Sequence, residues 1–383
     1  MANRFVLNET SYHGKGAIEQ IVPEIKARGF KKIFVTCTPD LIKFKVVNKV
    51  TDLLKKAKIP FVIYSDIQAN PSIENVKGGV KKLKEEKCDA IVAIGGGSSM
   101  DTAKAIAIII KNPEFKDVRS LEGVAPTKKP CLPILAVPTT AGTAAEVTIN
   151  YVITDIERKR KFVCVDVHDI PVVAFVDPDM MASMPKSLKA STGMDALTHA
   201  IEGYITLGAW ELSDMFHIKA IEIIGRSLKK SCEGKKDGEE GMALGQYVAG
   251  MGFSNVGLGV DHSMAHTLSA YYNMPHGMAC AVLLPTVMAF NAPNTGTKYR
   301  DIAKALGVKG TEKMTQAQYR KAAVEAVRKL SKAVGIPQSL KGIVKEEDIP
   351  ALAKSAYADA CRPGNPRPVT VKQIEELYRS LMK

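Results

Sequence analysis

The sequence lacks the cysteine patterns of a disulfide-linked or zinc-stapled domain. Its seven cysteines are scattered from Cys37 to Cys361, and no two of them form a C-x-x-C pair. The cysteines therefore suggest neither a disulfide framework nor a thiolate zinc cluster. Scattered thiols indicate a reducing compartment, and the N-terminal MANRFVLNETSYHG has no apolar signal segment. We expect a cytoplasmic protein.

Long apolar runs and arginine are also scarce. The longest apolar runs, such as AIAIII from Ala105 to Ile110, stop far short of the roughly 20 residues that a membrane span needs. Only 12 of the 53 basic residues are arginine, and no block of five like charges occurs. The net charge of +13 comes mainly from lysines that are spread along the chain. We therefore expect neither a membrane nor a nucleic acid as partner.

The chain does contain enough apolar material for more than one domain. Its 383 residues, 46% of them hydrophobic, allow two to three domains of roughly 150 residues each. The first half alternates strand-like and helical segments, which predicts an α/β domain with a parallel sheet covered on both faces. We expect strands at 31–37, 61–65, 89–97 and 133–140, and helices at 49–59 and 74–87.

The second half changes in texture. Its segments carry helical periodicity with few β-branched runs, which predicts an all-α domain. The proline-containing stretch at 176–187 marks the boundary, and the expected domains are 1–183 and 184–383.

A glycine-rich turn follows one of the predicted strands. The segment GGGSSMDTAKAIA, from Gly95 to Ala107, leads from a buried strand into a helix, where backbone N–H groups can bind a phosphate. We expect Ser98 to cap this helix and Asp101 to complete a capping box. Met100 breaks the G-x-G-x-x-G pattern, so a plain turn without a ligand stays open on this motif alone.

The next predicted strand also ends in small polar residues. The segment VPTTAGTAAEVTINYV places Thr139, Thr140 and Thr143 at the carboxyl end of the sheet. Open α/β sheets bind ligands at that edge. Threonine occurs in any turn, but two such loops after consecutive strands favour a ligand site.

Five of the seven histidines lie within 78 residues, and four of them, His199, His262, His266 and His276, form the candidate group. Asp195 and His199 are four residues apart on one face of a predicted helix, and His262 and His266 repeat the spacing. One carboxylate with two or three imidazoles suits Fe²⁺ or Zn²⁺ better than Mg²⁺ or Ca²⁺. Each pair also arises by chance among core residues, and spacing leaves open whether His266 is a ligand or a neighbour.

Together these motifs resemble those of one enzyme family. GGGSSMDTAKAIA, PTTAGTAAEVT, GMDALTHAIEGY and GLGVDHSMAHTLSAYYNMPHG occur in order, and nearly the whole chain is similar to the iron-activated (group III) alcohol dehydrogenases. The resemblance implies a Rossmann-like nucleotide-binding domain followed by a helical domain for metal and substrate, a dehydroquinate synthase-like fold. It also implies hydride transfer between NAD(P) and a small alcohol or 1,2-diol. The expected oligomer is a homodimer paired through an N-terminal strand, here RFVLN.

Matched motif by motif, the resemblance implies three groups of site residues. The ion, Fe²⁺ or Zn²⁺, is expected on Asp195, His199, His262 and His276, with His266 beside it as the catalytic group near the substrate. The dinucleotide is expected on Thr38, Asn70, Gly96, Gly97, Ser98, Thr139, Thr140, Thr143, Val152 and Lys161. The alcohol pocket is expected to include Asn150, Phe253 and Cys361.

Three positions depart from the family pattern, and one of them is Thr267, where relatives frequently carry Pro. NAD-preferring relatives usually carry Asp where Thr38 stands, and threonine cannot repel the 2′-phosphate of NADP. We therefore expect NADPH to be used alongside NADH. Asp261 stands where relatives are commonly apolar; it either orients a metal ligand through a hydrogen bond or faces solvent.

Other functions stay open at this point. Within the family, the alcohol is methanol, ethanol, butanol, 1,3-propanediol or a 1,2-diol such as 1,2-propanediol. A metal-dependent lyase like the dehydroquinate synthases needs clustered Arg and Lys for a phosphorylated acid, whereas the segments GMGFSNVGLG and AYYNMP beside the metal motifs are apolar. In a non-catalytic metal-storage or scaffold protein, the histidines would be only core or surface residues.

Overall fold

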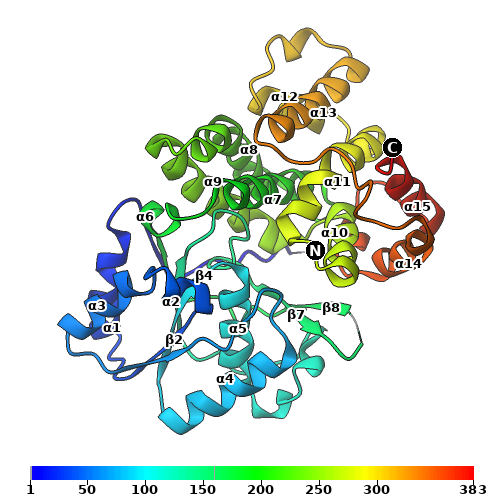
Figure 1. The fold of residues 1–383 in the computed structure, drawn as a ribbon. Helices are drawn as coiled ribbons and strands as arrows, with labels where there is room; N and C mark the ends of the chain where they lie inside the picture. Colours follow the sequence, from blue (N-terminus) through cyan, green and yellow to red (C-terminus); the bar gives the residue numbers. More distant parts are fainter. Residues whose placement is uncertain (1, 159) are drawn as a thin grey trace. The chain divides into compact units, whose positions relative to one another are not determined.

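The computed structural model describes residues 2–158 and 160–383 (Figure 1). The chain forms two compact units, Met1–Met184 and Pro185–Lys383. All strands of the described residues belong to the first unit, and the second is built from helices. Within the described part of the chain, no helix is both long and apolar enough to cross a membrane.

The first unit contains a parallel six-stranded sheet, as the sequence predicted. Its strand order is β1-β9-β6-β4-β2-β3. The strands are β1 (Thr10–His13), β2 (Ile33–Thr36), β3 (Phe61–Tyr64), β4 (Ala90–Gly95), β6 (Ile134–Pro138) and β9 (Val173–Val176). The two strands β1 and β9 were not predicted. They are four residues long, and the sequence of β1, TSYH, has no apolar alternation.

Helices cover both faces of this sheet because successive side chains of each strand point to opposite faces. Ile33 and Val35 of β2 enter a core with α1 (Ile21–Ala27) and α3 (Asn48–Lys56). Phe34 enters the opposite core. That core is shared with α4 (Ile73–Glu86) and α5 (Gly97–Lys111). Burial on both sides explains the continuous apolar runs from which these strands were predicted.

A second, three-stranded sheet has the order β5-β8-β7 and is held to α5 by charged side chains. Its strands are β5 (Gly123–Val124), β7 (Asn150–Asp155) and β8 (Arg160–Val165). Lys104 is fully buried, and its Nζ donates to the carbonyl oxygens of Thr148 (2.5 Å) and Asn150 (3.0 Å). Helix α5 therefore fixes the position at which β7 begins.

The predicted capping box at the start of α5 is wrong. Gly96 is the N-cap, and no side chain caps the helix. Asp101 instead accepts a hydrogen bond from the Val152 backbone N–H (3.1 Å), through its Oδ2. Burial raises the pKa of Asp101 to about 6, although Lys104 and this bond oppose the shift. The carboxylate is used to hold β7, so it does not cap its own helix.

The second unit is helical, as predicted. Its helices are α7 (Lys186–Ile205), α8 (Glu211–Cys232), α9 (Lys236–Val256), α10 (Val260–Tyr272), α11 (His276–Asn291), α12 (Lys298–Ala305), α13 (Gln316–Ala333), α14 (Ile349–Ala358) and α15 (Val371–Ser380). Two short helices of the first unit, α2 (Pro39–Lys43) and α6 (Pro178–Met181), complete the set of α-helices in the described residues.

The replacement Lys104→Met should destabilise the protein. Lys104 and Asp169 are both fully buried, with Nζ and Oδ1 3.9 Å apart. Removal of one partner of a buried pair leaves an uncompensated charge, which costs about 3–5 kcal/mol in the free energy of unfolding. Urea unfolding followed by circular dichroism measures this loss.

A lysine on the surface provides the control for that loss. Lys81 of α4 is exposed, and Lys81→Met should change the free energy of unfolding by about 0.5 kcal/mol or less. The double variant Lys104→Met/Asp169→Asn should recover part of the loss, because no unpaired carboxylate remains. Equal urea midpoints for the two single variants would show that the buried pair does not stabilise the fold.

Candidate active site

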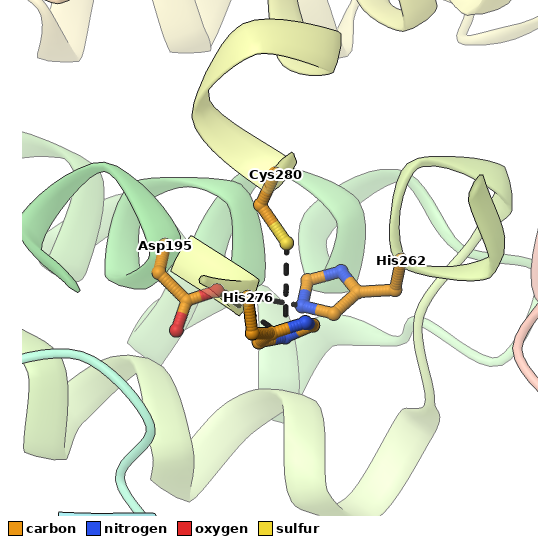
Figure 2. A group of neighbouring side chains, drawn as sticks. All are labelled: Asp195, His262, His276 and Cys280. Atoms are coloured by element: carbon orange, nitrogen blue, oxygen red, sulfur yellow. Dashed lines mark hydrogen bonds and ion pairs between the residues drawn. The ribbon is translucent and has the colours of Figure 1, made fainter. Parts of the chain in front are cut away.

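Four potential metal ligands from three helices meet in the second unit. Asp195 of α7, His262 of α10, and His276 and Cys280 of α11 place one donor atom each within 4.8 Å of the others (Figure 2). Asp195 Oδ1 lies 3.8 Å from His262 Nε2 and 3.6 Å from His276 Nε2. The structure therefore brings together three of the four predicted ligands.

The donor atoms of this group fit a cation. Asp195 and His262 are buried, and among the described residues Asp195 Oδ1 and His262 Nε2 have no hydrogen-bond partner. Buried polar atoms are almost always satisfied. Burial raises the pKa of Asp195 and lowers that of His262 to about 3, so the imidazole is neutral. A neutral imidazole is the form that binds a metal.

A buried glutamate orients His262. Glu202 Oε2 lies 2.7 Å from His262 Nδ1, and its Oε1 accepts the Asp261 backbone N–H at 2.8 Å. Burial raises the pKa of Glu202 to about 7, against the lowering effect of these backbone bonds. Because Nδ1 is engaged, Nε2 is the ring atom left for a metal. Glu202 was not predicted; its only signal is its place three residues after His199 in HAIEG.

Asp261 does not face solvent, so that alternative is wrong, and its carboxylate makes no hydrogen bond to a metal ligand among the described residues. It is fully buried, and its carboxylate oxygens have no hydrogen-bond partner among the described residues. Burial, together with the nearby Glu202 and Asp195, raises its pKa well above the usual value. A neutral carboxyl group is therefore expected at this position.

His199 lies beside the donor group, although its donor atom is outside the 4.8 Å set. Its ring centroid is 4.4 Å from that of His262, and its ring stacks on Phe253 at 4.1 Å. Cys280 takes the fourth place in the set. This thiol was not predicted, although it follows His276 by about one helical turn. The predicted pocket residue Phe253 thus contacts the metal-ligand region.

His266 is next to the donor group and has its own carboxylate. Its ring stacks with that of His276 at 5.3 Å between centroids. Its Nδ1 lies 2.8 Å from Oδ2 of Asp359. The other oxygen of Asp359 accepts the backbone N–H of Cys361 at 2.8 Å, so this predicted pocket residue is close by. Asp359 was not predicted, since it is 93 residues from His266 in the chain.

The predicted phosphate site lies in the first unit, where the glycine-rich turn lies close against the threonine loop. A Cβ at Gly96 would come within 2.8 Å of Thr140 Oγ1, and one at Gly97 within 3.1 Å of Thr143 Cγ2. The Thr139 backbone N–H donates to the Gly95 carbonyl at 3.0 Å. The two loops predicted to bind the dinucleotide therefore meet at the N-terminus of α5, where Ser98 lies in the first turn. Helix N-termini favour phosphate groups.

The other predicted dinucleotide residues lie around the same sheets. Lys161 of β8 donates to Asn70 Oδ1 at 2.6 Å, which joins two residues 91 positions apart. Val152 on β7 is bound to Asp101. Thr38 follows β2 as the N-cap residue of α2, and the predicted pocket residue Asn150 begins β7.

Comparison with known proteins decides the family. The sequence model described as iron-containing alcohol dehydrogenase matches residues 8–178, and that of the C-terminal part of the Fe-containing alcohol dehydrogenase family matches 189–382. The chain belongs to the iron-containing alcohol dehydrogenase family. This alcohol dehydrogenase is 59% identical to lactaldehyde reductase of Escherichia coli (strain K12) over 381 residues, which cover 99% of this chain and 100% of that protein.

More distant relatives of this alcohol dehydrogenase share its length and fold. NAD-dependent methanol dehydrogenase of Bacillus methanolicus is 37% identical over 99% of both chains. A crystal structure of 1,3-propanediol oxidoreductase superposes with a TM-score of 0.95 at 36% identity, over 100% of both chains. The protein is an oxidoreductase that uses a metal, a nicotinamide dinucleotide and a small alcohol or aldehyde. The matches favour neither the lyase nor the storage protein.

The replacement His276→Ala should weaken metal binding. Loss of even an outer partner of a ligand costs about 10–100-fold in metal affinity, and loss of a ligand should cost at least as much. Metal content per chain, measured by mass spectrometry after dialysis at limiting Fe²⁺, should fall from one ion to a small fraction. The exposed His13 of the first unit offers the control His13→Ala.

The same measurement distinguishes the two candidates for the fourth ligand. If His199 is a ligand, His199→Ala lowers the metal content while Cys280→Ser leaves it near one per chain. The reverse result would assign the position to Cys280. Undiminished metal in folded His276→Ala would contradict the whole ligand set.

Proposed function

We propose that this enzyme interconverts lactaldehyde and 1,2-propanediol with NAD(H) at a single Fe²⁺ ion. One observation carries the proposal: identity to lactaldehyde reductase is 59% along the whole chain. Methanol and 1,3-propanediol dehydrogenases reach only 37–38% over a similar length. The difference favours the 1,2-diol over the other small alcohols of the family.

The ion would be held by Asp195, His199, His262 and His276. When bound, a divalent cation there supplies the positive charge that polarises the oxygen of the aldehyde or alcohol. One carboxylate and three imidazoles accept iron and zinc alike. The family description favours Fe²⁺.

The residues of the chain itself position the reactants. Gly96, Gly97 and Ser98 offer backbone N–H groups to the pyrophosphate, with Thr140 and Thr143 closing the turn. The rest of the dinucleotide would be surrounded by the other residues predicted to bind it: Thr38, Asn70, Thr139, Val152 and Lys161. When bound, the nicotinamide would accept or supply the hydride, and His266 would exchange the proton with the substrate oxygen.

Pocket size and subunit pairing complete the proposal. Phe253 is buried against His199, and together with Cys361 it would line a pocket for a small alcohol. We also propose a homodimer. Strand β1 lies at an edge of the six-stranded sheet, where unpaired backbone groups can bind another chain. The exposed Leu7 lies in the preceding RFVLN segment.

A steady-state assay tests the proposed reaction. Metal-stripped protein is reloaded with Fe²⁺ or Zn²⁺, and NADH oxidation is followed with lactaldehyde, 3-hydroxypropanal, formaldehyde and butanal. The proposal predicts no turnover without metal and the highest kcat/KM for lactaldehyde. A higher kcat/KM for 3-hydroxypropanal or formaldehyde would assign the enzyme to another substrate.

Thr38 should permit the use of NADPH. Threonine carries no charge to exclude a 2′-phosphate, so kcat/KM with NADPH should be measurable beside that with NADH. In Thr38→Asp it should fall at least tenfold, because like charges placed together cost on the order of several kcal/mol. Thr38→Ser is the control and should keep NADPH activity. If the native enzyme rejects NADPH as strongly as Thr38→Asp does, another residue sets the preference.

A further inference from the structure

The carboxylate of Asp359 is held in one orientation. Asp359 follows the last turn of α14 as its C-cap residue. Its Oδ2 lies 2.8 Å from Nδ1 of His266. Its Oδ1 accepts two hydrogen bonds, from the Cys361 backbone N–H (2.8 Å) and from Ser263 Oγ (3.2 Å). Two donors on one oxygen fix the carboxylate plane and direct the other oxygen at the imidazole.

The pair is well shielded from water. The side chains of His266 and Asp359 are only 10% and 11% exposed. Burial alone would raise the pKa of Asp359, but His266 and the three hydrogen bonds hold it below the usual value. Asp359 is therefore an anion, and its carboxylate accepts a hydrogen bond from Nδ1–H of His266. An imidazole whose Nδ1 donates in this way keeps Nε2 as its one other polar atom.

We propose that Asp359 is a positioning residue that holds His266 as the Nδ1–H tautomer and leaves Nε2 as its proton-transfer atom. The inference rests on the proposed function. In alcohol oxidation, the O–H proton moves to Nε2 as the C–H hydride moves to NAD⁺. The products are the aldehyde, NADH and an imidazolium whose charge Asp359 stabilises. Aldehyde reduction returns the same proton to the oxygen.

The grouping of these side chains also resembles a small metal site, since donor atoms of His266, Asp359 and Cys361 lie within 4.8 Å of one another. The hydrogen bonds explain this grouping without a cation, because both oxygens of Asp359 already accept hydrogen bonds. A second bound metal ion at this place would overturn the proposal, and the experiment below includes that outcome.

The isosteric variant Asp359→Asn separates tautomer from packing. The amide oxygen of the new side chain must take the position that accepts the hydrogen bonds from Cys361 N–H and Ser263 Oγ. Its NH₂ group would then face His266. Nδ1 must then accept a hydrogen bond, and the proton moves to Nε2. The ¹⁵N shifts of histidine-labelled, Zn²⁺-loaded protein report the tautomer directly, with His266 assigned by comparison with His266→Gln.

We expect Nδ1–H in the native enzyme and Nε2–H in Asp359→Asn. In the Fe²⁺ enzyme, kcat for lactaldehyde should fall about 100-fold or more in that variant, with a much smaller change in KM. Asp237→Asn is the matched control, since Asp237 is exposed on α9, and it should leave both readouts unchanged.

Three results would overturn the proposal. They are an Nε2–H tautomer in native protein, unchanged kcat in folded Asp359→Asn, and a second equivalent of Zn²⁺ that Asp359→Asn abolishes. The native spectrum decides even if the variant fails to fold. If no aldehyde is turned over, the proposed function fails, while the tautomer still tests the role of Asp359.

Discussion

The second unit buries polar donor atoms that no hydrogen bond from the described residues satisfies. Asp195 Oδ1 and His262 Nε2 lie in the interior without a hydrogen-bond partner among the described residues. Such burial costs free energy unless a ligand compensates it. Helices α7, α10 and α11 must pack closely to bring these atoms together. Gly277 shows how closely: a Cβ there would come within 2.7 Å of the Ser191 carbonyl oxygen and 3.2 Å of Asp195 Cβ.

Carboxylates around this group orient the imidazoles. Glu202 engages Nδ1 of His262 and Asp359 engages Nδ1 of His266. Nε2 of His262 has no hydrogen-bond partner among the described residues and would be available to a metal. We propose that Nε2 of His266 is in the same way available for the proton. In the first unit, α5 likewise has two roles. Its N-terminus faces the threonine loop, and Asp101 and Lys104 hold β7.

Local patterns explain what the sequence could predict. Continuous apolar runs marked the buried strands β2, β4 and β6 and the edge strand β3. The i, i+4 spacing of Asp195 and His199 placed both on α7. The orienting carboxylates could not be found this way. Glu202 and Asp359 reach their histidines across 60 and 93 residues, and no local rule selects them. The capping box failed for a related reason, since Val152, 51 residues away, uses the Asp101 carboxylate.

X-ray absorption of the Zn²⁺-loaded enzyme tests the central claim most directly. With Asp195, His199, His262 and His276 as ligands, the first shell contains only nitrogen and oxygen at about 2.0–2.2 Å, with imidazole scattering beyond it. We expect this spectrum at one ion per chain. A sulfur shell at about 2.3 Å would place Cys280 on the metal, and a spectrum without imidazole scattering would contradict the site altogether.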